Sequence, residues 1–236
     1  MLNLSVIIPA YNEEHRIKET LNKIINHLNK KKYNYEIIIV DDGSKDKTIS
    51  IIQNIKNKKI RILKNEINKG KGYSIKRGVL NATRDLILFS DADLSTPIEE
   101  LDHFIKYLDY DIIIGSRALK ESNIIIHQPF YREYSGKIFN LFVKLFTVRG
   151  IKDTQCGFKL FKKDIAYNIF KKQTIDRFGF DVEILYIANK YNYKIKELPV
   201  HWLNDTKSKV SLFKDSIRMF LDLIKIRIND IKGLYN

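Results

Sequence analysis

Two acidic residues separated by a single residue are the part of this sequence best suited to chemistry. Asp91 and Asp93 follow directly on the apolar run 86–89 and precede the start of a helical pattern at 94–97. A strand that delivers two carboxylates to its C-terminal edge builds a small, oxygen-rich site, which suits Mg²⁺ or Mn²⁺ shared with the phosphates of a substrate. The pair therefore indicates a metal–diphosphate site, although Asp-x-Asp is by itself a short pattern.

Two further polar segments follow the first two apolar runs of the chain. Pro9-Ala10-Tyr11-Asn12-Glu13 comes directly after the first run, and Asp41-Asp42-Gly43-Ser44 comes after the second. Adjacent strand ends would bring an aromatic ring and several carboxylates to one crevice, which is suited to stacking a nucleobase and hydrogen-bonding a ribose. The alternative for the second segment is ordinary turn chemistry, with Ser44 or Asp46 capping the following helix.

A glycine-rich basic segment, Asn68-Lys69-Gly70-Lys71-Gly72, precedes a helical pattern at 75–80. Glycines allow the backbone to approach a ligand closely, and the N–H groups at the start of a helix attract an anion. The spacing differs from that of a P-loop. The segment therefore suggests an anion site but not a kinase-type nucleotide site.

Apolar runs rich in Ile and Val alternate with helical patterns through the first half, and these elements must position the motifs. The runs are 4–8, 36–40, 60–63, 86–89 and 112–114. Such strands, separated by helices, predict an α/β fold with a mostly parallel central sheet flanked by helices. One helical stripe comprises Ile17, Leu21, Ile24, Ile25 and Leu28. A capping box at 96–99 predicts a helix from about Pro97 to Leu108.

The pattern changes after Gly115. The segment 130–146 is too broadly apolar for a half-exposed helix, and Phe139 to Phe146 could receive a lipid chain or pack in the core. Helices are expected at 163–170 and 180–191, and a strand at 195–202. The last segment, 211–236, predicts a basic amphipathic helix that docks either on the core or on a membrane surface. Its apolar stripe comprises Phe213, Ile217, Phe220, Ile224 and Ile231.

Composition limits the class of protein. A chain of 236 residues with 44% hydrophobic residues and only 10 Gly and 4 Pro predicts one ordered main domain. The formal net charge of +14 favours an anionic partner, although Lys is scattered so widely that part of the excess is compositional. Nucleic-acid-binding signatures are missing, so no nucleic-acid partner is expected.

Cysteine content and hydropathy limit the compartment. Cys156 is the single cysteine, so no internal disulfide can form, which is compatible with a reducing compartment. No run approaches the roughly 20 apolar residues of a membrane span. We expect the first residues to form a strand rather than a secretory leader.

The motifs occur together in an order that resembles the inverting family 2 glycosyltransferases, in particular the branch that makes polyprenyl-phosphate sugars. The segments that carry the resemblance are 7–13, 40–44, 90–93 and 115–117. Two later blocks, 150–161 and 178–185, look particularly like dolichyl-phosphate β-glucosyltransferases. The resemblance runs from about Leu4 to Arg227 and implies a GT-A fold. It divides the catalytic domain, 1–210, into a nucleotide-sugar half at 1–118 and an acceptor half at 119–210.

The resemblance also implies roles for single residues. The nucleotide site would be lined by Pro9, Tyr11, Glu13, Ile39, Asp41 and Asp42. Asp91 and Asp93 would engage the diphosphate through Mg²⁺ or Mn²⁺, with Ala92 contributing backbone. Ser95 stands where related mannosyltransferases often place a Gln at the metal. Arg117 and Lys209 match basic positions near the phosphates.

Joining two anionic substrates also requires cations and, in some mechanisms, a base. Arg132 is the favoured residue for the acceptor phosphate, with Arg149 and Lys209 as further choices. Asp153 is the first residue to test as a base or acceptor-orienting group, and Asp181 is the second. For either aspartate the alternative is an ion pair with a neighbouring Arg or Lys.

The resulting hypothesis is a metal-dependent transfer of glucose from UDP-glucose to dolichyl or polyprenyl phosphate at the cytoplasmic face of a membrane. The chain would attach there through its terminal helix or through a membrane-anchoring partner. Transfer of mannose from GDP-mannose, or of another sugar to a lipid or glycan, is the alternative within the fold. A nucleotidyltransferase or a non-catalytic basic binding protein are the alternatives from other classes.

Overall fold

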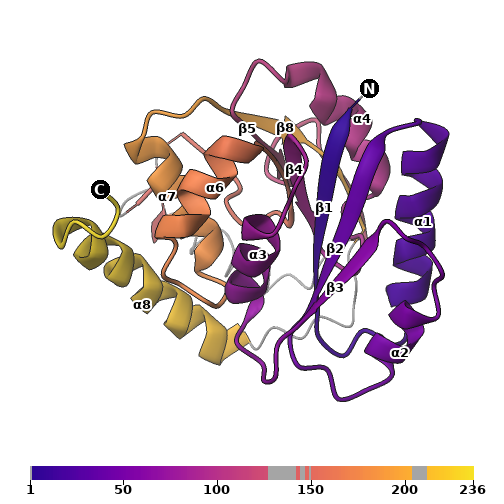
Figure 1. The fold of residues 1–236 in the computed structure, drawn as a ribbon. Helices are drawn as coiled ribbons and strands as arrows, with labels where there is room; N and C mark the ends of the chain where they lie inside the picture. The colour runs from indigo at the N-terminus through magenta and orange to yellow at the C-terminus, as the bar shows by residue number, and fades with distance from the viewer. Residues whose placement is uncertain (1, 127–141, 144–146, 149, 204–211) are drawn as a thin grey trace.

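The molecule is built around a seven-stranded sheet with the strand order β3-β2-β1-β4-β7-β5-β8 (Figure 1). The structure, a computed structural model, describes residues 2–126, 142–143, 147–148, 150–203 and 212–236. Strand β7 is antiparallel to both of its neighbours, β4 and β5, and the other pairs of the sheet are parallel. The predicted α/β class with a mostly parallel central sheet is therefore confirmed.

The strands of this sheet are β1 (Asn3–Ala10), β2 (Asn34–Asp41), β3 (Ile60–Lys64), β4 (Leu86–Ser90), β5 (Ile112–Ser116), β7 (Phe158–Lys162) and β8 (Ile195–Pro199). A separate two-stranded sheet pairs β6 (Asn123–Ile126) with β9 (His201–Leu203). The helices are α1 (Ile17–Lys30), α2 (Thr48–Gln53), α3 (Lys71–Leu80), α4 (Leu101–Phe104), α6 (Lys163–Lys172), α7 (Phe180–Lys190) and α8 (Leu212–Ile231).

The central strands are apolar on both faces because helices cover both faces of the sheet. In β1, Val6 and Ile8 join the core beneath α1, whereas Ile7 joins the core beneath α3 and α7. The predicted stripe of α1 is confirmed, with Leu21 and Ile24 fully buried and Ile25 half-buried. Figure 1 shows α1 and α2 on one side of the sheet and α3, α6 and α7 on the other.

A helical segment is present where one was predicted from Pro97 to Leu108, but most of it is 3-10 helix instead of α-helix. The structure has a 3-10 turn (Ile98–Glu100), one turn of α-helix in α4 and a second 3-10 turn (Ile105–Tyr107). Pro97 is extended, with φ −58° and ψ 147°, so it precedes the helical residues instead of occupying their first turn. No side chain caps this start, so the predicted capping box does not form.

The single strand predicted at 195–202 is also divided. β8 pairs with β5 as far as Pro199, and the chain then crosses to the small sheet, where β9 pairs with β6. Pro199 has no N–H for a further ladder bond, which favours the break at this point. The division matters for the site because Trp202, on β9, lies against Arg117, the residue that follows β5.

Helix α8 packs against α7 along the lower left edge of the molecule in Figure 1. Its buried side chains are Met219, Leu223 and Ile226. Phe220, Ile224 and Ile231 of the predicted stripe lie on the outer side and are exposed, while the side chains of Phe213 and Ile217 are outside the described set. Within the described residues, no helix combines the length and hydropathy needed to cross a bilayer.

Candidate active site

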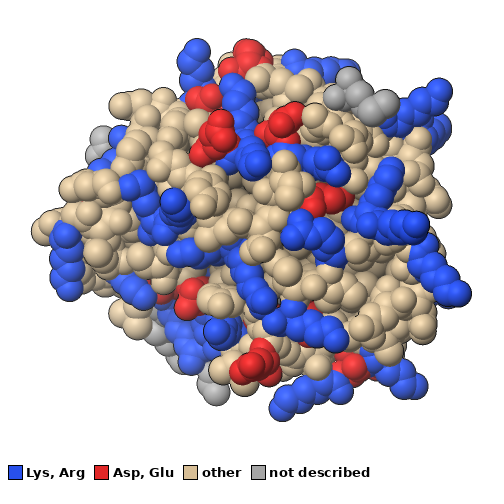
Figure 2. Space-filling view, in the orientation of Figure 1, with Lys and Arg blue, Asp and Glu red and all other residues tan. Residues whose placement is uncertain are grey.

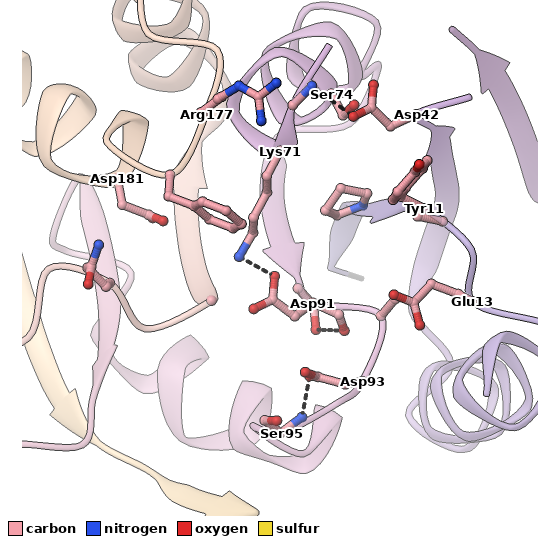
Figure 3. A pocket seen from close by; sticks show the side chains of 18 of the residues that line it. Tyr11, Glu13, Asp42, Lys71, Ser74, Asp91, Asp93, Ser95, Arg177 and Asp181 are labelled. Atoms are coloured by element: carbon pink, nitrogen blue, oxygen red, sulfur yellow. Dashed lines mark hydrogen bonds and ion pairs between the residues drawn. The ribbon is translucent and has the colours of Figure 1, made fainter. Parts of the chain in front are cut away.

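A pocket of about 400 Å³ lies at the carboxyl ends of β1, β4 and β5. The sheet order switches at β1, whose two neighbours β2 and β4 come from later parts of the chain, and ligands of open α/β sheets bind at such a switch point. Many of the residues predicted for the site line this pocket (Figure 3). They are Pro9, Tyr11, Glu13, Asp42, Asp91, Ala92, Asp93, Ser95, Arg117 and Asp181.

Asp91 and Asp93 lie where β4 ends, in a tight turn in which Leu94 has a positive φ of 48°. The Ser95 N–H donates to Asp93 Oδ1 at 2.9 Å, and the Asp91 N–H donates to the Gly157 carbonyl at 3.2 Å. Burial and the negative charge of Asp91 raise the pKa of Asp93 above its ordinary value. The two carboxylates therefore repel each other in a partly dehydrated pocket, an arrangement that a divalent cation would stabilise.

The donor set fits a metal that is shared with a substrate. Within the described part of the chain, no three His, Cys, Asp or Glu side chains form a ready metal cluster. Mg²⁺ and similar ions are often held by one or two carboxylates, with substrate phosphates and water completing the shell. Asp91 and Asp93 fit this requirement, with Ser95 beside them on the pocket wall.

Gly157 makes room for the carboxylate of Asp91. It immediately precedes β7, whose Phe158 pairs with Ser90 at the end of β4. A Cβ atom at position 157 would overlap the carboxylate of Asp91. Glycine is therefore required here by close approach, and the antiparallel strand β7 is the element that brings it to Asp91.

Lys71 enters the pocket from the first turn of α3 and was not among the predicted site residues. Its Nζ lies 2.6 Å from Asp91 Oδ1, and Figure 3 shows the side chain extending across the pocket to that carboxylate. Burial alone would lower the pKa of Lys71, but the negative charges of Asp91 and Asp181 outweigh burial and raise it. The glycine-rich segment, from which an anion site was predicted, thus brings the positive charge of Lys71 into the pocket.

Asp42 holds the segment that carries Lys71. The Lys69 N–H donates to Asp42 Oδ1 at 2.9 Å, and the Gly70 N–H donates to Oδ2 at 2.8 Å. Gly70 itself has a φ of 111°, a conformation open mainly to glycine. Asp42 lines the pocket as predicted for a nucleotide-site residue, but its hydrogen bonds fix the loop that precedes α3.

Ile39 and Asp41 do not line the pocket. Ile39 is fully buried in the core beneath α1. Asp41 is 3% exposed, and its Oδ2 accepts the Ser44 N–H at 3.2 Å. Its Oδ1 has no hydrogen-bond partner among the residues that the structure describes. A buried acceptor without a partner is costly, so this atom is suited to accept a hydrogen bond from a bound ligand.

Asp153 and Arg117 form a bidentate ion pair. Arg117 Nε donates to Asp153 Oδ2 at 2.7 Å and Nη2 donates to Oδ1 at 2.9 Å. Burial would raise the pKa of Asp153, but the charge and hydrogen bonds of Arg117 outweigh it and lower the pKa to about 2. A carboxylate held this strongly in its ionised form is a poor base. Asp153 therefore orients Arg117, which lines the pocket.

Asp181 is paired with a fully buried lysine. Lys159 Nζ donates to Asp181 Oδ1 at 2.5 Å and to the Cys156 carbonyl at 2.7 Å. Burial raises the pKa of Asp181, while Lys159 and Lys71 oppose that rise. Both aspartates considered as bases are thus in ion pairs, which is the alternative that the sequence left open for each.

Several pocket residues were missed, and three predicted ones cannot be placed. Gln155, Arg177, Trp202 and Met219 also line the pocket. Trp202 is the only tryptophan of the chain, and Arg117 lies over its ring at 5.4 Å from the centroid. Its uniqueness in the sequence was the signal that could have found it. Outside the described residues lie Arg132, Arg149 and Lys209, together with most of Phe139 to Phe146.

Known proteins of similar sequence share nearly the whole chain. A dolichyl-phosphate beta-glucosyltransferase from Dictyostelium discoideum is 42% identical over 248 residues, which cover 98% of this chain and 76% of the relative. The human dolichyl-phosphate beta-glucosyltransferase is 34% identical, with coverage of 98% of this chain and 77% of the relative. Residues 5–170 match the family described as glycosyl transferase family 2.

Solved structures of low sequence identity share the fold. Glucosyl-3-phosphoglycerate synthase from Mycobacterium tuberculosis, solved with Mn²⁺, UDP and glucosyl-3-phosphoglycerate, has a TM-score of 0.69 at 14% identity and covers 97% of this chain and 79% of its own. A mannosyltransferase from Pyrobaculum calidifontis, solved with GDP-Man and Mn²⁺, has a TM-score of 0.61 at 17% identity. The match covers 98% of this chain and 65% of the mannosyltransferase chain. From its sequence and its fold, the chain belongs to glycosyl transferase family 2.

Proposed function

We propose that this protein transfers glucose from UDP-glucose to dolichyl phosphate or a related polyprenyl phosphate and releases UDP. The observation that carries the proposal is the carboxylate pair Asp91 and Asp93, which shares one pocket with Lys71 and Arg117. The 42% identity to a dolichyl-phosphate beta-glucosyltransferase over 98% of the chain supports the choice of sugar and acceptor. The β configuration in that name is the outcome of inversion at C1 of an α-linked nucleotide sugar.

The donor would bind through residues 1–118 and the acceptor through residues 119–210. Pro9 and Tyr11 follow β1 and offer a flat, partly apolar wall for the uracil ring. Asp41 is also proposed to accept a base N–H at the end of β2, since its buried Oδ1 has no hydrogen-bond partner in the described structure. Lys71 and Arg177 offer positive charge along the same wall to the phosphates.

Asp91 and Asp93 would hold Mg²⁺ or Mn²⁺ together with the diphosphate. Such an ion stabilises the negative charge that develops on a departing nucleoside diphosphate. Gly157 leaves room for the Asp91 carboxylate, and the Ser95 N–H donates a hydrogen bond to Asp93. Lys71 would exchange its contact with Asp91 for one with a phosphate oxygen. Arg117, held by Asp153, would contribute positive charge near the phosphates.

The reaction needs little base catalysis. A phosphate oxygen of the acceptor forms the new bond to C1 of glucose, and the bond from C1 to the UDP oxygen breaks with its electron pair on UDP. The second pKa of a phosphate monoester is about 6, so the acceptor is largely ionised at neutral pH. This agrees with a site in which Asp153 and Asp181 are held as counterions. Arg132, Arg149 and Lys209 stay proposals for binding the acceptor phosphate.

We place the reaction at the cytoplasmic face of a membrane, where a lipid phosphate meets a nucleotide sugar. The lone Cys156 is buried and forms no disulfide, which is compatible with a reducing compartment. Attachment would use α8 or a membrane-anchoring partner.

The test is direct. The protein is incubated with dolichyl phosphate in detergent, with Mg²⁺ or Mn²⁺, and with labelled UDP-glucose or GDP-mannose in parallel. We expect label in an organic-extractable, mild-acid-labile product from UDP-glucose only, and none with Asp93→Asn. Product from GDP-mannose alone would assign the mannosyl alternative. The absence of product from either donor, with folded protein and added metal, would refute the proposal.

A further inference from the structure

Helix α8 has two apolar faces, and one of them packs against the part of the chain that the structure describes. Met219, Leu223 and Ile226 point inward and are at most 9% exposed. With 3.6 residues per turn, the opposite side of the helix carries four more apolar side chains. These are Leu221, Ile224, Ile228 and Ile231, with exposed fractions of 56%, 43%, 45% and 83%. We call these four residues the outer stripe.

An outer stripe of this kind is unusual on a protein surface. Single exposed apolar residues are common, but a contiguous row on one helix marks a surface that binds something. The helix is also long enough to matter, because α8 has 20 residues. Its mean composition is too polar for a membrane span, and the whole described part of the chain contains no such span. A helix with these properties suits the plane of a membrane interface.

Charge supports a lipid surface as the occupant. Arg218, Lys225 and Lys232 recur every seven residues and are exposed. At that spacing they form a row along one flank of the outer stripe, where long basic side chains can reach lipid headgroups while their stems cover apolar surface. Figure 2 shows Lys and Arg side chains spread over the whole visible face, so net charge alone does not select a docking surface. The combination of the outer stripe with the basic row on its flank does select a docking surface.

A second copy of the chain or a partner helix is less well supported. The outer stripe has the spacing of a coiled-coil seam, since its members alternate three and four residues apart. It extends over fewer than two heptads, whereas a stable seam needs about three or four. A membrane surface is therefore the better supported occupant, and dissociation of a dimer on substitution of the stripe would indicate a second copy instead.

The position of α8 connects this surface to the reaction. Met219, on the inner face, lines the pocket, and Gln155 Nε2 lies 3.9 Å from its Sδ atom. The outer stripe begins two residues later, at Leu221. One helix thus contributes both to the pocket wall and to the exposed apolar row. A lipid acceptor whose phosphate reaches this pocket has its chain in the membrane, so the two faces would serve one substrate.

We propose that the outer stripe of α8 lies in an anionic membrane surface and presents the pocket to lipid-embedded acceptors. The part that concerns the acceptor rests on the proposed function; the membrane contact does not. The stripe would enter the boundary between headgroups and acyl chains, and Lys225 and Lys232 would contact anionic headgroups. Activity would then depend on the lipid surface as well as on the acceptor concentration.

The first test measures membrane binding by flotation of the full-length protein with phosphatidylcholine vesicles, with and without phosphatidylserine. We expect binding that requires phosphatidylserine and weakens with salt. Ile228→Glu should bind at least about tenfold more weakly. Tyr167→Glu on α6 is the matched control, because Tyr167 is 43% exposed and receives the same new charge. Thermal unfolding and circular dichroism establish that both variants are folded.

A second pair of variants isolates the charges. Lys225→Gln with Lys232→Gln should weaken binding to anionic vesicles about thirtyfold, since each lysine near such a surface contributes about a factor of five to ten. Lys18→Gln with Lys30→Gln removes the same charge from α1, on the far side of the molecule in Figure 1, and should leave binding unchanged. Equal loss in both pairs would mean that net charge alone drives binding, which would overturn the assignment to α8.

Two acceptors separate this proposal from the proposed function. With dolichyl phosphate embedded in vesicles, Ile228→Glu should lose transfer in proportion to binding. With a short isoprenyl phosphate free in solution, it should match the wild type. If the wild type transfers glucose to neither acceptor, the proposed function fails while flotation still tests α8. Wild-type protein that does not float, or an outer stripe whose substitution instead dissociates a dimer measured by light scattering, would overturn the membrane proposal.

Discussion

The buried pair of Lys159 and Asp181 allows a quantitative test of whether Asp181 acts as a base or as a counterion. The side chain of Lys159 is fully buried and that of Asp181 is 5% exposed. Substituting Lys159→Met keeps the side-chain volume similar but leaves the Asp181 carboxylate without its main partner. Removing one member of a buried ion pair costs about 3–5 kcal/mol. Lys71 also faces Asp181, so we expect the lower end of that range.

The loss of stability in Lys159→Met should depend on pH in a defined direction. Burial already raises the pKa of Asp181, and loss of Lys159 raises this pKa further. A group whose folded-state pKa is raised binds more protons in the native state, so stability falls as pH rises above the unfolded value of about 4. The deficit of Lys159→Met should therefore be small near pH 4–5 and reach its full size near pH 8.

Urea unfolding of the wild type and Lys159→Met at several pH values measures this deficit. About 3 kcal/mol corresponds to a lower Tm by roughly 6–12 °C for a chain of this size. The double variant Lys159→Met with Asp181→Leu should recover most of the stability, because a buried pair can often be replaced by apolar groups at little cost. A deficit below about 1 kcal/mol at pH 8 would refute the counterion role. A stable but inactive double variant would instead restore a chemical role for Asp181.

Three further predictions concern the pocket. Asp153→Asn should lower stability by about 2 kcal/mol at pH 7, because the wild-type pKa of about 2 confers stability that is present above pH 4 and lost on acidification. The variant should therefore lose less stability than the wild type between about pH 4 and pH 2, which acid titration followed by circular dichroism checks. Gly157→Ala should displace the Asp91 carboxylate and lower kcat about a hundredfold with an unchanged fold, and unchanged kcat would contradict the close approach. Lys71→Met should lower kcat/KM for the nucleotide sugar about a hundredfold, and a change confined to the acceptor KM would contradict its place at the diphosphate.

The sheet and the position of the acidic pair were predictable because their signals are local. Runs of Ile and Val mark buried parallel strands, and an acidic pair directly after such a run lies at the carboxyl end of the sheet. Strand β7 carries a weaker signal. Its alternation places Lys159 at a fully buried position, where the sequence alone gives no reason to bury a lysine. The distant Asp181 supplies the opposite charge, and the Cys156 carbonyl accepts a second hydrogen bond.

Other features depended on contacts that periodicity cannot report. The basic segment before α3 indicated an anion site, but its direction toward Asp91 depends on the hydrogen bonds of Asp42. The apolar residues of α8 indicated an amphipathic helix without showing which of its apolar sides meets α7. The structure packs the side with Leu223, so Ile224 lies outward.

The distribution of ion pairs around the pocket supports the proposal that the acidic pair, and not a base, carries the reaction. Lys71 faces Asp91, Arg117 faces Asp153 and Lys159 faces Asp181. Asp93 has no ion pair in the described structure, and its pKa is raised by burial and by Asp91. Positive charge is therefore lacking at Asp93, beyond the carboxyl end of β4. A substrate that arrives as a metal–diphosphate complex would supply that charge and free Lys71 for the phosphates. The site is thereby matched to a leaving group that carries its own cation.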